Sequence, residues 1–560
     1  MDVMSQLMDQ KNQPPTLSRR SFIAGLTTAA AGAAALGLAG CTTPAGGGSS
    51  DGGGQASYLP ATWDAEADIV VVGYGGAGAA AAIEAAKAGA NVLIIEKAPE
   101  GYEGGNTSCA GGAWMTPTTE NNAGLFDFIK YQMTPTVQDE EIKAFCEELK
   151  GTSDWVTSLG GEVALTASPG MGYLHYPGAD AVAGLSRIKN GAGWDLFQVL
   201  KQATENYSNV TIKYETPAKK LIFNPETKEV FGVVATSGGQ DINLKAKKAV
   251  ILALGGYEHN PQIMSQYAFP HVEIYPWGTP YNEGDGLPMV MEVGAKVRHF
   301  WSVEWGSFNV KGASVKAGGI AAALVYQKPQ FDNAILVNSQ AVRFQNEIKP
   351  VTGGGFPTPT HDKGPVASTF IDSPKGTYPN RPFYMVFDET KRAAGPIPAM
   401  AAPGAAQSWL GKHQDIYSWS SDNMAEINSG IILKADTIED LAVKAGLDAT
   451  VLAATVAKWN AACAAGVDAE FGRASQLTPI ATAPFYLTEM ALSIINTQGG
   501  PDRDGEHHVL DWQGKPIPRL YAGGEFGSIY GFLYQGAGNI PEALGNRYSG
   551  INAAKETPWE

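Results

Sequence analysis

The clearest pattern of hydrophobic positions lies near residue 70, where a run of β-branched residues is followed at once by glycines and then by alanines. Residues 68–72 predict a buried strand, and residues 79–88 predict a helix of small side chains. A second apolar run at residues 92–95 predicts the next strand. Strand, glycine turn, helix and strand in this order are typical of a parallel sheet covered by helices.

The same alternation continues to about residue 260 and predicts a doubly wound α/β domain. From residue 301 to 494 the pattern changes to proline- and glycine-rich loops, with an amphipathic helical stretch at residues 437–465. Residues 497–554 return to the pattern of the first part. We therefore predict one discontinuous domain, residues 64–300 and 495–560, with a second domain inserted at residues 301–494.

The first 60 residues do not follow this pattern. Arg19 and Arg20 precede an Ala/Gly/Leu-rich stretch that is too short and too glycine-rich for a membrane-spanning helix. This order resembles a twin-arginine export signal, and the Leu-Ala-Gly-Cys sequence ending at Cys41 resembles the lipobox of bacterial lipoproteins. We predict a signal at residues 1–41 and a flexible linker at residues 42–63, with Cys41 anchoring the exported protein to the extracytoplasmic face of a membrane. A buried N-terminal helix is the alternative.

Composition and charge restrict the partners. Hydrophobic residues make up 44% of the chain and charged residues 17%, as in packed globular domains. The formal net charge of -16 argues against a nucleic-acid partner, which requires basic patches. Apart from Cys41, the widely separated Cys109, Cys146 and Cys463 form no haem-attachment or iron–sulfur pattern, and we predict no metal site.

The glycine turn after the first strand has the spacing of a dinucleotide-binding site. Gly73 makes the turn, Gly75 allows a pyrophosphate to approach closely, and Gly78 lets the helix pack on the strand. The first amides of the helix then face the pyrophosphate. Glu96 follows the second strand about 20 residues later, where a carboxylate accepts hydrogen bonds from the adenosine ribose. These residues leave open whether the ligand is NAD or FAD.

The glycine-rich segment at residues 104–112 resembles the second flavin motif of the fumarate reductase and 3-oxosteroid dehydrogenase superfamily. Residues 216–222, 250–256 and 520–525 resemble further segments of that superfamily in the same order. The resemblance covers residues 66–555 and implies a Rossmann-like, FAD-binding α/β domain with an inserted α+β capping domain. The predicted FAD contacts are Gly73, Gly75, Gly76, Ala77, Gly78, Glu96, Lys97, Gly105, Asn106, Thr107, Ala110, Gly111, Gly112, Ala218, Gly255, Gly256, Gly524, Glu525, Asn539 and Ile540.

Asn106 stands where respiratory members of this superfamily attach the flavin covalently to a histidine. The resemblance therefore implies non-covalent FAD. Because the cysteine spacing offers no second redox centre in the chain, the flavin must exchange electrons with another molecule. We predict a membrane cytochrome or a quinone-linked protein as this partner.

Three substrate-binding segments of the fumarate and acrylate reductases are altered in this chain. The arginine that acts as the general acid in those enzymes corresponds to Val351 in this chain. A segment starting at Asn496 stands in place of their histidine segment, and Tyr534 stands in place of their substrate-binding arginine. Arginines in those enzymes hold substrate carboxylates in bidentate pairs. Their loss argues against a dicarboxylate substrate.

The segment around Tyr534 resembles instead the Tyr-x-Gly-x-Gly segment of the 3-oxosteroid dehydrogenases. By that resemblance, the Tyr534 hydroxyl and the Gly538 amide form an oxyanion hole for a ketone oxygen that gains charge during hydride transfer. Tyr173 and Tyr176 resemble another tyrosine segment of that family and are predicted to line the site. His361 is a candidate proton donor, with simple solvation in its loop as the alternative.

The aromatic residues Phe300, Trp301, Trp305 and Phe308 suit a flat apolar ligand, and they suit a domain core equally well. The partner expected on the substrate side is therefore a small apolar ketone.

These patterns predict hydride transfer between flavin N5 and an activated carbon–carbon bond of a steroid-like or aromatic enone, with reduction as the favoured direction. One alternative is a divergent acrylate reductase that binds a carboxylate with Lys349, Arg381 or His361. The other is a lipoprotein that binds a ligand or stores electrons without turnover.

Overall fold

The computed structural model describes residues 58–118, 122–268, 272–321, 323–325, 331–348, 371–398, 417–533 and 538–559. The predicted signal, its anchor Cys41 and most of the predicted linker lie outside the described residues, as do Lys349, Val351, His361 and Tyr534. The described part of the linker is packed: Tyr58 stacks on Phe231 with ring centroids 5.8 Å apart. The folded body therefore begins before residue 64.

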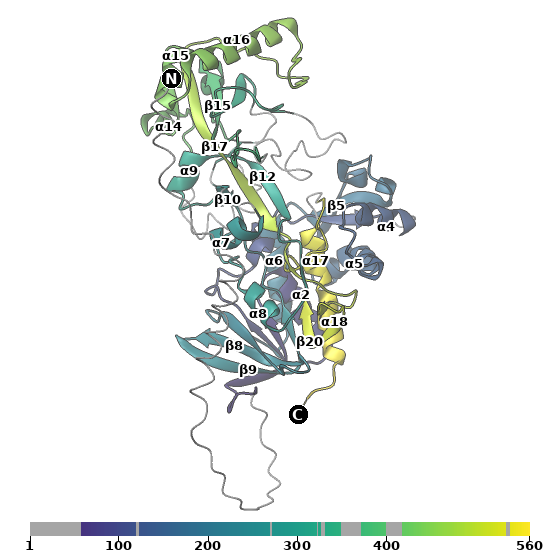
Figure 1. Ribbon diagram of the computed structural model, residues 1–560. Helices are drawn as coiled ribbons and strands as arrows, with labels where there is room; N and C mark the ends of the chain where they lie inside the picture. The colour runs from purple at the N-terminus through teal and green to yellow at the C-terminus, as the bar shows by residue number, and fades with distance from the viewer. Residues whose placement is uncertain are drawn as a thin grey trace, which may run out of the picture. The chain divides into compact units, whose positions relative to one another are not determined.

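The first sheet has eight strands (Figure 1). They are β1 (Ala65–Val72), β2 (Val92–Ile95), β6 (Val210–Lys213), β7 (Ala218–Phe223), β8 (Val230–Ser237), β9 (Gln240–Leu252), β19 (His508–Leu510) and β20 (Pro516–Ala522). In the order β19-β20-β9-β1-β2-β6, β1 runs parallel to both β2 and β9. β7 and β8 extend the sheet beside β9 in antiparallel pairs. β20, which lies near the end of the chain, pairs in parallel with β9.

Helices cover this sheet closely. They are α2 (Gly76–Lys87), α6 (Gly193–Glu205), α17 (Asn539–Gly545) and α18 (Arg547–Lys555). The side chains of β1 alternate between two apolar clusters, with Val70 in one and Val71 in the other, so the strand is buried on both faces. A Cβ added at Gly550 would lie 2.1 Å from the Ala81 oxygen, which shows how closely α18 packs on α2. These features confirm the predicted doubly wound α/β domain.

A smaller layer follows the second strand. Its elements are α3 (Gly105–Cys109), α4 (Asn122–Tyr131), α5 (Asp139–Ser158) and an antiparallel sheet of β3 (Trp114–Pro117), β4 (Val163–Ala167) and β5 (Val182–Ile188). The glycine-rich segment at residues 104–112 contains a short helix. This helix carries Asn106 and Thr107 into the site described below.

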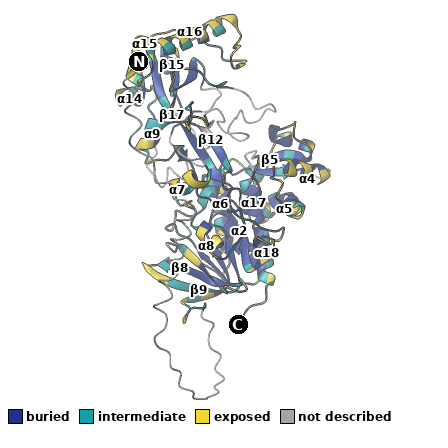
Figure 2. Ribbon diagram, viewed as in Figure 1, coloured by how far each residue is buried: buried dark blue, intermediate teal, exposed yellow. Residues whose placement is uncertain are grey.

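The inserted region forms a second sheet of seven strands. They are β10 (Ile274–Pro276), β12 (Val303–Val310), β13 (Leu324–Val325), β14 (Ala334–Asn338), β15 (Phe383–Asp388), β16 (Leu433–Ala435) and β17 (Phe485–Thr497). The order is β13-β12-β17-β15-β14, and β10 and β16 also pair with β17. Figure 2 shows β17 buried along most of its length. β10 belongs to this sheet although it lies within the range predicted for the first domain.

The helical stretch predicted at residues 437–465 is two helices, α15 (Ile438–Ala445) and α16 (Ala449–Ala465). The break falls at Gly446, whose φ of 71° ends α15 in a left-handed conformation. Other short elements are α7 (Pro261–Ile263), α8 (Gly286–Glu292), α9 (Lys311–Lys316), α12 (Glu389–Ala393), α14 (Met424–Asn428), β11 (Val297–Arg298) and β18 (Gly500–Pro501). None of the helices in the described ranges is long and apolar enough to span a membrane.

Candidate active site

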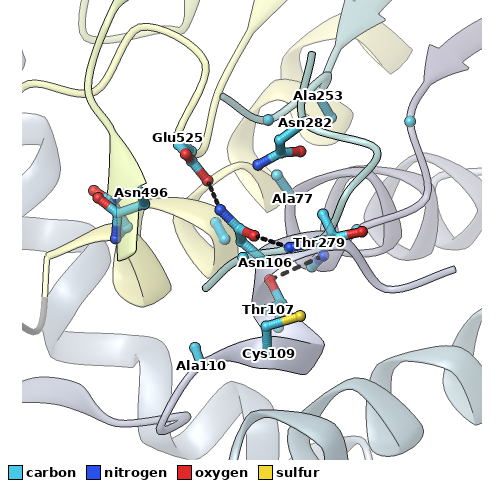
Figure 3. A pocket seen from close by; sticks show the side chains of 18 of the residues that line it. Ala77, Asn106, Thr107, Cys109, Ala110, Ala253, Thr279, Asn282, Asn496 and Glu525 are labelled. Carbon is cyan, nitrogen blue, oxygen red and sulfur yellow. Dashed lines mark hydrogen bonds between the residues drawn. The ribbon is translucent and has the colours of Figure 1, made fainter. Parts of the chain in front are cut away.

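A cavity of about 510 Å³ lies where the glycine turn after β1, helix α3 and the ends of β12 and β17 come together. This volume is typical of a cofactor or small-molecule site. We call the part formed by the glycine turn, Glu96, Lys97 and Ala218 the near end. The part formed by Asn106, Glu304, Trp305, Asn496 and Glu525 is the far end. Figure 3 shows Asn106, Asn496 and Glu525 around the cavity.

The near end is shaped by backbone. Gly73 has a φ of 100°, and a Cβ there would lie 2.4 Å from the Ala253 oxygen, so only glycine fits without a shift. A Cβ at Gly78 would lie 1.9 Å from the Gly73 oxygen. Helix α2 starts beside the cavity with Gly75 as its N-cap, which has no side chain to cap the helix, and the Gly76 amide donates to Thr107 Oγ1 at 3.2 Å. Its first turn therefore presents backbone amides to an anion.

Glu96 and Lys97 close the near end. The Tyr74 amide and the Ala98 amide each donate a hydrogen bond of 2.7 Å to the Glu96 carboxylate. Burial raises the pKa of Glu96. Lys97 pairs with Glu283 at 2.9 Å and with Asp285 at 2.5 Å.

Asn106 holds the centre of the far end. Its Nδ2 donates to Glu258 Oε1 at 2.7 Å. The same Nδ2 donates to Glu525 Oε2 at 2.9 Å, and Asn106 Oδ1 accepts from the Thr279 amide at 2.9 Å (Figure 3). Asn282 Nδ2 also donates to Glu258 Oε1 at 2.9 Å. One amide side chain therefore joins two carboxyl groups that come from distant parts of the chain.

These two carboxyl groups are buried and repel one another. Burial raises the pKa of Glu258 to about 7. The pKa of Glu525 is raised well above its usual value, first by burial and then by the charge of Glu258. Buried carboxyls so close together titrate as a pair, because the second ionisation is opposed by the first charge. The pair therefore retains a proton near neutral pH.

The ends of two strands of the second sheet close the far end. Glu304 on β12 and Asn496 on β17 are register partners, and Asn496 Nδ2 donates to Glu304 Oε2 at 2.6 Å. Gln498 Nε2 donates to Asn496 Oδ1 at 2.7 Å. Trp277 and Trp305 line the wall beside them. The far end thus combines carboxyl, amide and indole groups.

One arginine lines the cavity in the described part of the chain. It is Arg187 on β5, whose neighbour Leu185 faces the cavity from the same strand. The Arg187 Nε is buried and has no hydrogen-bond partner. A buried unpaired donor carries a desolvation cost that a bound oxygen atom would remove.

A family model described as an FAD binding domain matches residues 68–540. This chain belongs to that family. It is 27% identical over 599 residues to the digoxin reductase of Eggerthella lenta, covering 97% of this chain and 98% of the relative. It is also 27% identical over 511 residues to the urocanate reductase of Eggerthella lenta, covering 87% of this chain and 75% of the relative.

A solved structure of the 3-ketosteroid delta1-dehydrogenase from Sterolibacterium denitrificans has the same fold. It matches with a TM-score of 0.66 and 22% identity, over 88% of this chain and 100% of that chain. This likeness confirms the predicted α/β fold of the FAD-binding family. The chain is an FAD-dependent oxidoreductase of carbon–carbon bonds, as the sequence predicts.

The residues of the cavity fit FAD. The N-terminus of α2 suits a pyrophosphate, and Glu96 stands at the end of β2, where a ribose is bound in this fold. At Gly111, which also lines the cavity, a Cβ would meet no atom within 4 Å. A flat ring can therefore approach the backbone there, whereas a side chain would occupy that space.

Most of the predicted FAD contacts line the cavity. They are Gly73, Gly75, Gly76, Ala77, Glu96, Lys97, Gly105, Asn106, Thr107, Ala110, Gly111, Gly112, Ala218, Gly255, Glu525, Asn539 and Ile540. Gly78, Gly256 and Gly524 lie behind this lining. A Cβ at Gly256 would lie 2.2 Å from Glu525 Oε1, and one at Gly524 would lie 2.7 Å from the Ala77 Cβ. These three glycines position the lining through close packing.

The predicted catalytic residues are dispersed. Tyr173 and Tyr176 are not among the residues that line the cavity; they are buried in an apolar cluster with Phe128 and Tyr530. The structure therefore places both tyrosines in a core, because their rings pack on neighbouring aromatics. Gly538 directly precedes α17 and is buried beneath the Tyr530 ring. Tyr534 and His361 lie outside the described residues.

The aromatic residues of the inserted region have different positions. Trp305 lines the cavity, whereas Phe308 belongs to the core. Phe300 packs on Tyr257 with ring centroids 5.8 Å apart, and Trp301 is 51% exposed. Only one of the four therefore borders the cavity. Arg381 does not border it, and its Nη2 donates to the Glu273 oxygen at 2.9 Å.

The sequence patterns did not predict Glu258, Glu304 or Arg187 as residues of the site. Glu258 had a local signal, because a carboxylate two residues after Gly256 follows a strand that enters the flavin domain. Glu304 had no local sequence signal, because its partner Asn496 is 192 residues away and only the pairing of β12 with β17 brings the two together. The alternating pattern of β5 offered a weak signal for Arg187.

Proposed function

We propose that this protein is an exported, lipid-anchored reductase that uses non-covalently bound FAD to reduce the activated double bond of a conjugated ketone. FAD supplies hydride chemistry at N5 when it is bound. The near end holds the adenosine and pyrophosphate through Glu96 and the first turn of α2. Both polar atoms of Asn106 are engaged by neighbouring groups, and an amide offers no nucleophile for a covalent flavin link.

The charged groups of the far end are the observation on which the proposed substrate class rests. Glu304 and Glu525 line this end, with Glu258 buried behind them, whereas Arg187 is the one arginine on the described lining. A dicarboxylate requires paired guanidinium groups, whereas the described lining carries one guanidinium group and several carboxyl groups. A neutral ketone avoids that conflict, and Trp277 and Trp305 provide apolar walls for a flat ring.

The ketone oxygen needs donors as negative charge develops on it. We assign this role to Tyr534 and to the Gly538 amide. Two lining residues, Asn539 and Ile540, directly follow Gly538, which supports a position near the reacting group. Tyr534→Phe should lower kcat about 100-fold and leave the FAD content unchanged.

Anaerobic oxidation of reduced viologen tests the substrate class. The purified holoenzyme is given a panel of conjugated ketones and a panel of acrylates of matched carbon skeleton. Turnover of the ketones, with acrylates at least about tenfold slower in kcat/KM, supports the proposal. Turnover of acrylates without ketones overturns it.

Arg187 favours a second candidate function, the reduction of an unsaturated carboxylic acid. Its unpaired Nε is the one arginine donor available to a carboxylate on the described lining. If this candidate is correct, Arg187→Met should raise KM for acrylates at least about tenfold. Arg381→Met is the matched control, because Arg381 bonds to the Glu273 backbone and does not border the cavity.

The proposal also covers the location of the protein and its redox partner. Cys41 and the residues before it support lipid anchoring after export, and the cysteine spacing supports an external electron donor such as a membrane cytochrome or a quinone-linked protein. Cys41→Ser should move the protein from the membrane fraction to the soluble fraction. Continued membrane association of that variant would contradict the anchor.

A further inference from the structure

We propose that the carboxyl group of Glu304 transfers the proton that accompanies hydride transfer. This inference rests on the proposed function. In the reducing direction, a hydride from reduced FAD forms a C–H bond at one carbon of the double bond. The Glu304 O–H bond then breaks, and the proton forms a C–H bond at the neighbouring carbon. The double bond becomes a single bond, the two electrons come from the reduced flavin, which would return to oxidised FAD, and the carboxylate regains its proton from water.

The position of Glu304 supports this role. It lines the far end of the cavity and is 4% exposed. It lies near the end of β12 that pairs with the last residues of β17, so the two strands hold it firmly against the site. A general acid has to be fixed within reach of the reacting atom and shielded from bulk water, and this position provides both.

Two amide side chains orient the Glu304 carboxyl. Asn496 Nδ2 donates to Glu304 Oε2 at 2.6 Å, and Gln498 Nε2 fixes the Asn496 amide by donating to its Oδ1 at 2.7 Å. The Gln498 backbone amide in turn donates to the Ser302 oxygen at 3.0 Å. The chain of donors runs from the backbone to the carboxyl, which fixes the carboxyl in one orientation.

The other carboxyl groups on the described lining have interactions that assign them to other roles. Glu96 is held by two backbone amides at the near end, and Asp285 pairs there with Lys97. Glu525 is bound by Asn106 and by the Thr497 amide. Glu304 is the carboxyl that the second sheet contributes to the described lining. It therefore faces the substrate side, whereas the others belong to the cofactor side.

Four holoenzyme variants separate this role from a structural one. Glu304→Gln keeps an acceptor for Asn496 and removes the transferable proton. Glu304→Asp keeps the acid and shortens its reach. Asn496→Ala keeps the acid and removes its orienting donor. Glu489→Gln is the matched control, because Glu489 lies on β17, away from the cavity, and pairs with Lys311 at 3.1 Å.

The probes are 2-methyl-2-cyclohexen-1-one and tiglate, reduced anaerobically with reduced viologen. Protonation of either probe at its methyl-bearing carbon creates a stereocentre, so the enantiomeric ratio of the product reports the face from which the proton arrives. FAD content, thermal unfolding and the Kd of the saturated ketone for the oxidised holoenzyme are measured on the same samples. These binding and stability readouts do not depend on turnover.

We expect Glu304→Gln to lower the rate at least about 100-fold and to lose the enantiomeric excess, since proton transfer by a side chain contributes about that much. Glu304→Asp should recover about a tenth of the wild-type rate, and Asn496→Ala should retain more activity than Glu304→Gln. FAD content and the Kd of the saturated ketone should stay within about threefold of wild type. The Glu489→Gln control should match wild type throughout.

A Glu304→Gln enzyme that keeps the wild-type rate and enantiomeric ratio would overturn the inference while leaving the proposed function intact. Equal losses in Glu304→Gln and Asn496→Ala, together with lost FAD, would also overturn it in favour of a structural role. If Glu304→Gln does not fold, wild-type behaviour of Glu304→Asp overturns it. A wild-type enzyme that reduces neither probe would overturn the proposed function, and the inference with it.

Discussion

The two ends of the cavity are built in different ways. The near end comes mainly from one stretch of chain, from Gly73 to Lys97, and its key contacts are made by backbone amides and glycines. The far end is assembled from segments far apart in the sequence: Asn106 and Glu525, which share a hydrogen bond, are 419 residues apart. The near end therefore depends on local backbone geometry, and the far end depends on tertiary packing.

This difference in construction corresponds to two different roles, cofactor binding and substrate recognition. Every enzyme that uses FAD must hold the same adenosine diphosphate, which a strand, a glycine turn and a helix N-terminus can provide. The substrate differs between enzymes, and it is recognised by side chains that a stable scaffold brings together. We infer that the near end binds and the far end reacts. The following changes test that separation.

The largest effect is expected at Gly78. The Cβ of Gly78→Ala would lie 1.9 Å from the Gly73 oxygen, so α2 or the glycine turn must shift. Overpacking of this kind costs about 3 kcal/mol, which corresponds to roughly 100-fold weaker FAD binding. A titration with FAD, followed by flavin fluorescence, measures this loss of affinity.

Gly151→Ala is the control for Gly78→Ala. Gly151 lies inside α5, where the nearest atom to an added Cβ is 3.7 Å away. Alanine favours a helix interior over glycine, so the control should bind FAD as wild type does and be slightly more stable. Unchanged FAD affinity in Gly78→Ala would refute the role assigned to the turn.

Asn106→Leu should have the next largest effect. It removes the donor that Glu258 and Glu525 share, and each buried acceptor left without its partner costs about 1–3 kcal/mol. The melting temperature of the holoenzyme should fall by several degrees at fixed FAD concentration. Asn552→Leu, at an exposed hydrogen bond to Glu506, should change stability by less than about 0.5 kcal/mol. Equal melting temperatures for the two variants would contradict this assignment.

Glu258→Gln should change the dependence of stability on pH. The folded-state pKa of Glu258 is raised from 4.5 to about 7, so the folded protein binds this proton more tightly than the unfolded chain does. This contribution to stability is complete below about pH 4.5 and is lost as the pH rises through about 7. A glutamine does not titrate, and the variant should lose less stability than wild type between these values.

Urea unfolding of the holoenzyme across this pH range measures how the free energy of unfolding changes with pH in each variant. We expect the difference between wild type and Glu258→Gln to reach the order of 1–3 kcal/mol. Glu140→Gln, on an exposed side chain, makes the same change of charge and should keep the wild-type slope. Parallel slopes for wild type and Glu258→Gln would show that the carboxyl pair does not retain a proton.

Lys97→Met should have the smallest effect. Its partners Glu283 and Asp285 are 56% and 37% exposed, and ion pairs of this kind contribute about 0–1 kcal/mol. FAD affinity should fall by less than about threefold, and the loss should shrink further at high salt. A tenfold loss measured by FAD titration would mean that the near end relies on side-chain charge after all.

The sequence predicted the near end well because its information is local. Gly73, Gly78 and Glu96 follow one another at a spacing typical of a strand, turn and helix, and the structure places all three at or directly behind the cavity. The apolar run of β1 likewise predicted the strand that precedes the glycine turn. Patterns of this kind need no knowledge of distant contacts.

The far end was predicted in part. Asn106 and Glu525 were found through segments that resemble a known superfamily, whereas their bridging partner Glu258 was not. Glu304 meets Asn496 only because β12 pairs with β17, and a strand register across 192 residues leaves no trace in either local sequence. Tyr173 and Tyr176 were assigned to the site from a similar segment, but the aromatic cluster around them decides their position.

The most direct test of the division between the two ends is a displacement titration of bound FAD with ADP. ADP carries the part of the cofactor that the near end is proposed to hold. Wild type and Glu304→Gln holoenzymes are titrated side by side, and flavin fluorescence reports release. Displacement midpoints that agree within about twofold are predicted, because the change lies at the far end. A midpoint shifted tenfold in Glu304→Gln would contradict the account, since the far end would then contribute to holding the cofactor.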